Sequence, residues 1–479
     1  MRNFLILIIF FSLVIFTGRA KGQTDGARDP SFVIGTGFVN SVLATAIQSD
    51  GKILVGGSFT FYNGTPQNRL VRLNTDGSID TSFKTGTGFN ADGDAYVKAI
   101  IIQADGKILV GGSFTTYNGT VQNRIARLNT DGSIDTSFNS GSGFGSPGGG
   151  FIFINTIAVQ PDGKILAGGR FNIYNGKPQS HITRLNADGS LDTSADWRCS
   201  QDVDTIVIQS DGKILVGGSF TYTGYFYNQK HIVRLHPNGT LDESFKIGTG
   251  FYVSGVARIE SIAIQPDGKI LVGGYFTTYR DLPQNHIARL NNDGTLDNSF
   301  MIGTGFNFPV NTIRILGDGK ILIGGGFSTY NETTQNRLVR LHTNGNLDTT
   351  FDIGTGFSGI LGNIRSISIQ ADGKYIIGGY FTSFNNSPQN RIIRMSAKAL
   401  SVTDQRKKEL NLYPNPVDET LNFSEEVSDI KIIELSGRMV AQILGVRKSA
   451  NLPKLPKGVY LVKATYISGE IVTYRIVKK

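Results

Sequence analysis

The sequence predicts an all-β protein: a seven-bladed β-propeller of four-stranded blades, closed by its N-terminal strand and followed by a small C-terminal β-sandwich. The triplet Asp-Gly-Lys occurs seven times between Asp50 and Asp372, at spacings of 49 to 57 residues. Short apolar runs without helical periodicity surround each copy, and a segment missing from the last copy stands at the start of the chain. Repeats of this length, each with four short strands, are typical of propeller blades.

In the first repeat, we expect strands over residues 41–48, 53–59, 69–73 and 79–83, with the first strand innermost. Asp-Gly turns separate the strands, because both residues tolerate the backbone of a tight hairpin. Every repeat also has a phenylalanine after a glycine pair, and we expect these rings to be buried between sheets that the glycines let approach closely. They are Phe59, Phe114, Phe171, Phe220, Phe276, Phe327 and Phe381.

An arginine on the third strand is followed eight residues later by an aspartate in six repeats, as in Arg72 and Asp80. A three-residue loop with glycine in the left-handed position would place the two side chains opposite each other as an ion pair. The seventh arginine, Arg394, has no such aspartate. The segment "DPSF" at 29–32 copies "DTSF" of the other repeats, so we expect Asp29 to face Arg394 and to close the ring.

Residues 29–398 resemble the delta-60 repeat family of β-propeller proteins, through "QxDGKILVGG[SY]F" and "QN[RH][IL]xRLNxDG[ST][IL]DxSF". The resemblance implies a propeller and says little about activity. The predicted organisation is a signal peptide over 1–22, the propeller over 23–398, a polar linker over 399–409 and a C-terminal domain over 410–479.

Charge and cysteine content exclude some classes of partner. The net charge is +9, but residues 23–400 hold only +2 of it and show no basic stripe, so we expect no nucleic-acid partner. No segment after the signal peptide is apolar enough to span a membrane. The single cysteine, Cys199, excludes an internal disulfide, and stability must come from packing.

The tail resembles the C-terminal sorting domain of type IX secretion cargo of Bacteroidetes. The resemblance rests on "YPNP" at 413–416, "LSG" at 435–437, "KGVYLVK" at 457–463 and the basic end at 478–479. It implies the type IX secretion machinery as partner, export to the cell surface or beyond, and either anchoring or release. The alternative is an ordinary surface-binding β-domain. The implied sorting residues are Tyr413, Pro414, Asn415, Pro416, Lys457, Gly458 and Tyr460.

Candidate metal and catalytic motifs are weak. Asn74, Asp76 and Asp80 alternate as calcium ligands can, but other copies read "HPNGTLD", which favours a plain turn. His181, His231 and His286 share one position in three different blades, so they cannot converge on one metal. No nucleophile motif and no phosphate-binding loop is present. We therefore expect no cofactor and no enzymatic activity.

Two groups of aromatic residues are candidates for ligand binding, and packing between blades is the alternative for the first group and for the tryptophan. One group is the repeated tyrosine after the second strand: Tyr62, Tyr117, Tyr174, Tyr279 and Tyr330. The other lies in the fourth repeat, which departs from the pattern: Trp197, Tyr222, Tyr225, Phe226 and Tyr227. Trp197 could instead fill the place where Ala195 replaces the usual phenylalanine.

These patterns predict a secreted or surface-anchored, monomeric binding propeller whose ligand is an extracellular protein or glycan. One alternative is a carbohydrate-active enzyme at the propeller axis, and another is a structural component of the surface layer. Two carboxylates from different blades facing the central channel would favour the enzyme. Self-association without a ligand would favour the structural component.

Overall fold

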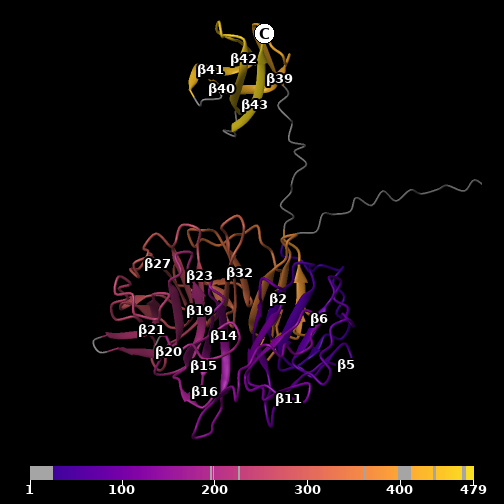
Figure 1. The fold of residues 1–479 in the computed structure, drawn as a ribbon, viewed down its shortest axis with the longest axis vertical. Helices are drawn as coiled ribbons and strands as arrows, with labels where there is room; N and C mark the ends of the chain where they lie inside the picture. Colours follow the sequence, from indigo (N-terminus) through magenta and orange to yellow (C-terminus); the bar gives the residue numbers. More distant parts are fainter. Residues whose placement is uncertain are drawn as a thin grey trace, which may run out of the picture. The chain divides into compact units, whose positions relative to one another are not determined.

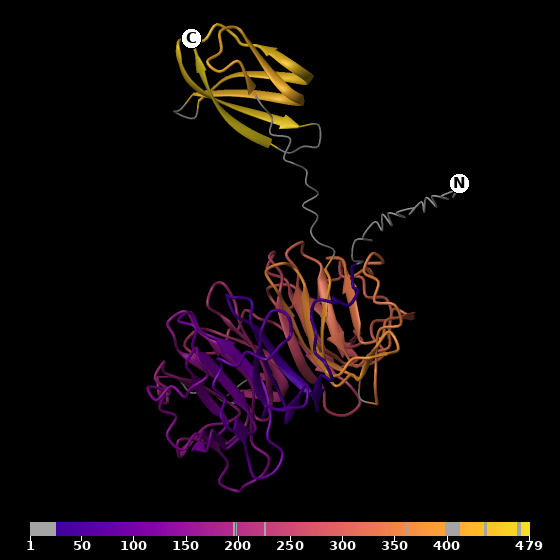
Figure 2. The same cartoon turned by 90° about the vertical axis from the view of Figure 1, so that its right-hand side faces the viewer.

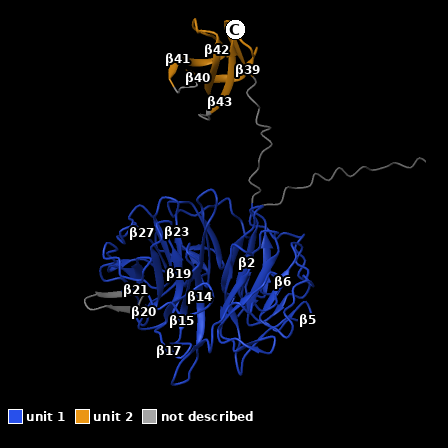
Figure 3. Cartoon of the chain, viewed as in Figure 1, with its two compact units in different colours: residues 1–399 blue, residues 400–479 orange. Residues whose placement is uncertain are grey.

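The computed structural model describes residues 25–194, 197, 199–224, 227–360, 362–397, 412–434, 438–466 and 471–479. Side chains are not described at 221–229, 466 and 471. The chain divides into two compact units, residues 1–399 and 400–479, and every regular element described is a β-strand (Figures 1 and 3). The predicted signal peptide, the predicted linker and the "LSG" motif lie outside the described residues.

Unit 1 is a ring of seven blades, each built on a three-stranded antiparallel sheet. The inner strands are β2 (Val42–Ile47), β8 (Val97–Ile102), β14 (Phe153–Val159), β19 (Val203–Ile208), β23 (Arg258–Ile264), β28 (Val310–Ile315) and β34 (Ile364–Ile369). The middle strands are β3 (Ile53–Gly57), β9 (Ile108–Gly112), β15 (Ile165–Arg170), β20 (Ile214–Gly224), β24 (Ile270–Tyr275), β29 (Ile321–Gly325) and β35 (Tyr375–Gly379). The outer strands are β6 (Leu70–Leu73), β12 (Ile125–Leu128), β18 (Ile182–Leu185), β21 (Tyr227–Leu235), β27 (Ile287–Leu290), β32 (Leu338–Leu341) and β38 (Ile392–Met395).

The first strand of each repeat is innermost, as predicted. Each inner strand contacts the inner strands of both neighbouring blades, and β34 contacts β2, so the ring is complete (Figures 1 and 2). The glycine pairs make the close approach possible. A Cβ on Gly56 would lie 2.5 Å from a methyl of Val97 in the next blade, and Gly378 stands in the same relation to Val42 across the seam. The seven phenylalanines are at most 1% exposed.

The predicted fourth strand is reduced to a single bridge, Leu73 to Ile79, with one further hydrogen bond from Asp80 N to Arg72 O of 2.9 Å. The chain turns away there, because Phe83 N donates to Asp80 O and the Asp80 carboxylate accepts from Ser82. The three-residue loop over 75–77 is present, with Gly77 at φ +92°.

The predicted ion pair is also present. Arg72 Nε donates to Asp80 Oδ2 at 2.7 Å, and the equivalent pair occurs in the next five repeats. Arg72 Nη1 also donates to Thr130 O of the following blade at 2.6 Å. The arginine thus joins two strands of its own blade to the turn of its neighbour, and the stacked blades are linked around the ring.

The N-terminal strand closes the ring as predicted. Arg28 bridges Met395, Asp29 N donates to Arg394 O at 2.8 Å, and Arg394 Nε donates to Asp29 Oδ2 at 2.7 Å. The N-terminal segment also contacts the sixth blade. Arg340 Nη2 donates to the carboxylate of Asp25 at 2.6 Å.

Small secondary sheets form where the linker between blades meets the loop after the middle strand, so these two segments share one face as predicted. Most of these sheets have three strands: β1 (Phe38–Val39), β4 (Phe61–Tyr62), β5 (Thr65–Pro66); β7 (Phe89–Asn90), β10 (Thr116–Tyr117), β11 (Thr120–Val121); β13 (Phe144–Gly145), β16 (Ile173–Tyr174), β17 (Lys177–Pro178); β22 (Phe251–Tyr252), β25 (Thr278–Tyr279), β26 (Leu282–Pro283); β33 (Phe357–Ser358), β36 (Ser383–Phe384), β37 (Ser387–Pro388). In the sixth blade, the pair is β30 (Thr329–Tyr330) and β31 (Thr333–Thr334). In the fourth blade, β20 and β21 instead continue as one hairpin, paired as far as Gly224 and Tyr227.

Unit 2 contains β39 (Leu412–Tyr413), β40 (Thr420–Glu434), β41 (Met439–Asn451), β42 (Gly458–Tyr466) and β43 (Ile471–Lys478). They form one connected antiparallel sheet rather than two separate ones, because the long strand β40 pairs with β39, β41 and β42. Leu421 and Phe423 from the first part of β40 share one core with Ile430 and Ile432 from its second part. Unit 2 is therefore a strand-rich domain with one five-stranded sheet and one core.

Candidate functional site at the propeller axis

The inner strands surround a cavity of about 540 Å³ at the axis of unit 1. All seven blades contribute to its lining, because each presents one edge of its first strand to the axis. A volume of this size is in the range of small-molecule sites in proteins. The axis is therefore the first place to look for a ligand site.

One position of the repeat changes chemistry from blade to blade around this cavity. It is the second residue of the inner strand by repeat alignment, and its neighbours along the strand stay apolar or small. The residues there are Leu43, Lys98, Asn155, Asp204, Glu260, Asn311 and Arg365. The ring therefore keeps its scaffold while the side chain at this position changes around the channel, with only asparagine occurring twice.

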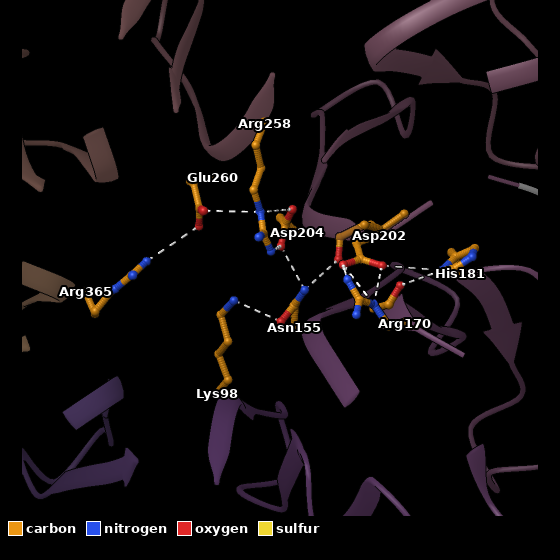
Figure 4. Close-up of polar contacts among 11 residues, drawn as sticks. Lys98, Asn155, Arg170, His181, Asp202, Asp204, Arg258, Glu260 and Arg365 are labelled. Atoms are coloured by element: carbon orange, nitrogen blue, oxygen red, sulfur yellow. Dashed lines mark hydrogen bonds and ion pairs between the residues drawn. The ribbon is translucent and has the colours of Figure 1, made fainter. Parts of the chain in front are cut away.

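Arg258 lies between the two carboxylates of the channel (Figure 4). Its Nε donates to Asp204 Oδ2 at 2.7 Å and its Nη2 donates to Asp204 Oδ1, while the same Nε is 3.2 Å from Glu260 Oε1. Asp204 is on β19 and both Arg258 and Glu260 are on β23, so the cluster joins two adjacent blades. Both carboxylates thus share one guanidinium.

Two further cations extend the cluster around the channel. Lys98 Nζ donates to Asn155 Oδ1 at 2.9 Å, and Asn155 Nδ2 donates to Asp204 Oδ1 at 2.8 Å. From the seventh blade, Arg365 Nη1 is 3.8 Å from Glu260 Oε2 (Figure 4). The network therefore joins blades two, three, four, five and seven through polar contacts.

The cluster shifts the pKa values of its own members. Burial, together with the nearby charge of Glu260, raises the pKa of Asp204 to about 6 despite the contact with Arg258. Burial alone would raise the pKa of Glu260, but the positive charges of Arg258, Lys98 and Arg365 outweigh it and lower the pKa. Burial lowers the pKa of Lys98, which Arg258 and Arg365 lower further. The two carboxyl groups therefore differ in proton affinity.

Aromatic and charged side chains stand at one mouth of the channel, where the chain enters the inner strands. Arg170 forms a two-point ion pair with Asp202, with Nη2 at 2.6 Å from Oδ2, and its guanidinium is 5.2 Å from the ring of Phe153. Tyr96 lines the channel, and Tyr380 lies 5.6 Å from the guanidinium of Arg365. These rings differ from blade to blade, as the channel residues do.

A second cavity of about 510 Å³ adjoins the first and shares Glu260, Asn311 and Arg365 with it. Phe308 and Tyr275 line it and are 60% and 43% exposed. Exposed aromatic side chains beside a charged cavity are typical of recognition surfaces. The site thus has a polar centre and a partly apolar rim.

The five repeated tyrosines do not form a binding surface, and this part of the sequence prediction is wrong. Each is at most 2% exposed, and each hydroxyl donates to a glycine carbonyl, as in Tyr62 to Gly77 at 2.6 Å. Each also packs at a tilt against the linker phenylalanine of its blade, with centroids 4.4 Å apart for Phe38 and Tyr62. The packing alternative therefore holds for Tyr62, Tyr117, Tyr174, Tyr279 and Tyr330.

Trp197 is also a packing residue rather than a surface residue. It is 2% exposed, and its ring lies 5.2 Å from the guanidinium of Arg184, in the place where Phe83 meets Arg72 in the first blade. The hypothesis that Trp197 contacts a ligand is therefore wrong. Tyr225 and Phe226 lie outside the described residues, and Tyr222 and Tyr227 are described only by their backbone in β20 and β21.

The candidate calcium loop is occupied by its own turn contacts. Asp76 Oδ1 accepts from Ser78 N and Oγ at 2.9 and 2.7 Å, and Asn74 donates to Ser78. The three histidines belong to different blades, and His181 and His286 each contact a carbonyl of the glycine pair in their own blade. Among the described residues, no cluster of His, Cys, Asp and Glu is suited to hold a metal ion.

The tail motif has a structural role in unit 2. Asn415 Nδ2 donates to Arg475 O at 3.0 Å, and Val477 N donates to Asn415 Oδ1 at 2.9 Å, so "YPNP" is bonded to the last strand. Tyr460 is 5% exposed and donates to Pro456 O at 2.9 Å, whereas Tyr413 is exposed. Gly458 begins β42, directly after Lys457.

The channel residues were missed because the repeats were compared for what they share. The useful signal lies in the residues that differ between otherwise similar repeats. Lys98, Asp204, Glu260 and Arg365 stand at one position of the repeat, and Arg258 stands two residues before Glu260. Scaffold positions repeat because every blade meets the same neighbours, so a varying position facing the axis indicates function.

Comparisons with known proteins place both units in families. A model described as "Domain of unknown function (DUF5122) beta-propeller" matches residues 48–83, 103–138, 160–194, 209–245, 265–300, 316–351 and 370–397. The chain belongs to the DUF5122 β-propeller family. After the propeller, residues 411–479 of the chain match a model described as a secretion system C-terminal sorting domain. The sorting domain assigns it to export by the type IX secretion system, to the cell surface or the extracellular space.

Several solved structures resemble this DUF5122 propeller in fold. PorZ, a surface component of the type IX secretion system of Porphyromonas gingivalis, is 15% identical, with a TM-score of 0.44 over 91% of this chain and 59% of that chain. The extracellular domain of a putative hybrid two-component system of B. thetaiotaomicron is 14% identical, with a TM-score of 0.44 over 93% and 56%. Virginiamycin B lyase from Staphylococcus aureus is 15% identical, with a TM-score of 0.44 over 74% and 94%.

This DUF5122 propeller spans less than two thirds of the length of the first two structures, and the likeness concerns the fold alone. No curated protein matches the chain. Within the described residues, no helix is long and apolar enough to cross a membrane.

Proposed function

We propose that this protein is an exported binding module, not an enzyme, whose ligand enters the axial channel of the propeller. The observation that carries the proposal is a varying position of the inner strands, where Lys98, Glu260 and Arg365 face one cavity while the scaffold repeats. A repeated scaffold needs only to close, so the side chains at its axis are free to specialise.

The carboxylate pair favours a second candidate, a hydrolase acting on sugars. Asp204 and Glu260 come from different blades, and their surroundings push their pKa values in opposite directions, as a general acid and a nucleophile or base require. Against this, Arg258 occupies both Asp204 oxygens and contacts Glu260, so both carboxylates hold a cation. Binding is therefore the stronger proposal.

An array of extracellular proteins and glycans, probed with the mature chain and with Leu43→Trp, tests the proposal. Leu43 lines the cavity, so the larger ring should fill part of the channel without changing its charge. We expect the variant to lose the ligands that the parent chain retains. Lys177→Gln is the matched control, because Lys177 is exposed on the short strand β17, in a loop outside the channel lining.

Equal binding by Leu43→Trp and the parent would contradict an axial site. Breakdown of a bound glycan by the parent chain, abolished in Glu260→Gln, would instead support the hydrolase. The thermal transition of Leu43→Trp must first show that the variant is folded, because only a folded variant tests whether the ligand binds at the axis.

A further inference from the structure

The axial channel carries more positive than negative charge. Its lining includes Lys98, Arg258, Arg314 and Arg365 against two carboxylates, Asp204 and Glu260. Arg258 balances one of these two carboxylates, so Lys98, Arg314 and Arg365 remain against one carboxylate and the lining keeps a positive formal charge. Positive charges confined in a channel attract an anionic ligand.

Arg365 and Lys98 have donors to spare. Arg365 Nε is buried without a hydrogen-bond partner, and the 3.8 Å from Arg365 Nη1 to Glu260 Oε2 exceeds a hydrogen bond. Lys98 Nζ has three donors and donates to the neutral Asn155 Oδ1 at 2.9 Å. A buried donor without a partner costs free energy, so it is a place where a ligand atom would be stabilised.

Figure 4 shows Lys98 and Arg365 on neighbouring sides of the open centre of the cluster, with Glu260 and Arg258 beyond them. Lys98 comes from β8 and Arg365 from β34, so the first blade and its uncharged Leu43 stand between them. An anion at the centre would meet both cations, and the acidic side of the ring would lie across from it.

The remainder of the lining suits a sugar. Thr45 and Ser366 line the channel, and their hydroxyls, which bond each other at 2.7 Å, keep further acceptor capacity. Tyr96 and Tyr380 also line the channel with aromatic rings. Hydroxyls bond the hydroxyls of a sugar, and an aromatic ring covers its apolar face. A cavity of about 540 Å³ accommodates one or two sugar rings more readily than a protein loop.

We propose that the axial channel binds a sugar acid, and that Lys98 and Arg365 hold its carboxylate. This inference rests on the proposed axial binding function and names the chemistry of the ligand. The carboxylate accepts from the Lys98 ammonium and the Arg365 guanidinium, and Arg314 adds positive charge to the channel. Glu260 opposes the anion and limits binding to acids whose charge lies on the side of the second and seventh blades.

Ligand-observed NMR with galacturonate and glucuronate, each beside its neutral counterpart galactose or glucose, tests the inference on the mature chain. Glutamate serves as a carboxylate without a sugar ring. We expect saturation transfer to both sugar acids and none to the neutral sugars or to glutamate. Binding that weakens as salt is added would agree with a charged contact.

Variants of the ring sharpen the test. Lys98→Gln and Arg365→Gln should each weaken sugar-acid binding about tenfold or more, the usual effect of losing a hydrogen bond to a charged group. Glu260→Gln should tighten sugar-acid binding, because it removes a negative charge that opposes the anion. Lys177→Gln, outside the channel, should bind as the parent does.

Equal signals from sugar acids and neutral sugars, or no signal from either acid, would overturn the inference. Equal binding of glutamate would assign the site to acidic peptides and also overturn it. These outcomes differ from a failure of the proposed axial function. If the axial function fails, Leu43→Trp still binds every ligand that the parent chain binds on the array.

Discussion

At the residue scale, the buried arginine and aspartate pairs hold the blades together. Asp135 accepts from Arg127 Nε at 2.6 Å and from Lys107 Nζ at 2.9 Å, and it is 6% exposed. Burial alone would raise the pKa of this carboxyl, but bonds from Ser137, Lys107 and Arg127 outweigh burial and hold the pKa well below its usual range. The same shift occurs at Asp29, Asp80, Asp192, Asp242, Asp297 and Asp348.

These pairs predict how stability depends on pH. The pKa of each aspartate is lower in the folded than in the unfolded chain, so the stabilisation is complete above the unfolded value of about 3.9 and is lost as pH falls below it. We expect these pairs to contribute no pH dependence to the thermal midpoint between pH 7 and pH 5, and to lower the midpoint steeply below about pH 4. Asp135→Asn should cost roughly 3–5 kcal/mol at pH 7 and make the decline shallower. A midpoint that rises on acidification to pH 3 would contradict this.

Trp197 allows a second prediction at this scale. Because its ring is buried beside Arg184, Trp197→Ala should lower the free energy of unfolding by about 3–5 kcal/mol, and Trp197→Phe should restore most of it. Phenylalanine stands at this place in the other blades, as Phe138 does against Arg127. Urea denaturation measures the difference. An alanine variant as stable as the parent would show that the ring is dispensable for packing.

At the element scale, the repeat pattern predicted much of the architecture. The register of Arg72 with Asp80 and the closure by Asp29 followed from sequence, because an ion pair and a turn constrain which residues lie opposite. The length of the fourth strand did not follow. The Asp80 side chain accepts from Ser82 N at 3.0 Å and turns the chain after a single bridge, and this bond competes with strand pairing.

The closing segment should be essential to the ring. Deleting residues 23–34 would remove the bridge to Met395 and the carboxylates of Asp25 and Asp29, which contact Arg340 and Arg394. It would also leave a sheet edge exposed. We expect a loss of several kcal/mol in unfolding free energy, measured by chemical denaturation. Asp29→Asn, which keeps the strand, should lose only part of it. An undiminished transition after the deletion would contradict closure by this strand.

At the scale of the whole molecule, the candidate site could not be predicted from what the repeats share. Tyr62 and its equivalents repeat because they are packed, whereas Lys98 and Glu260 differ because they face the axis, where no neighbouring blade fills the space. Which side chains share one cavity depends on the closed ring. The local sequence does not tell how far apart residues of different blades lie. The varying positions were nevertheless visible in the repeats themselves.

We expect the C-terminal domain to be needed for export of the chain and not for folding of the propeller. Removing residues 405–479 should leave the propeller's thermal transition in place, because unit 2 has its own core, and should abolish appearance outside the outer membrane. Asn415→Ala is a finer change, since it breaks the bonds of "YPNP" to Arg475 O and Val477 N. Cell fractionation is the measurement. Truncated chain found outside the cell at the parental level would refute the role of the tail.

The most direct test of an axial binding site compares two variants against the strongest ligand from the array. Leu43→Trp fills part of the channel, whereas Tyr225→Ala changes a residue of the fourth repeat that the sequence suggests as part of a binding surface. Titration calorimetry gives the dissociation constants. We predict at least about a tenfold weaker constant for Leu43→Trp and an unchanged one for Tyr225→Ala. Weak binding by Tyr225→Ala together with full affinity in Leu43→Trp would contradict the axial site.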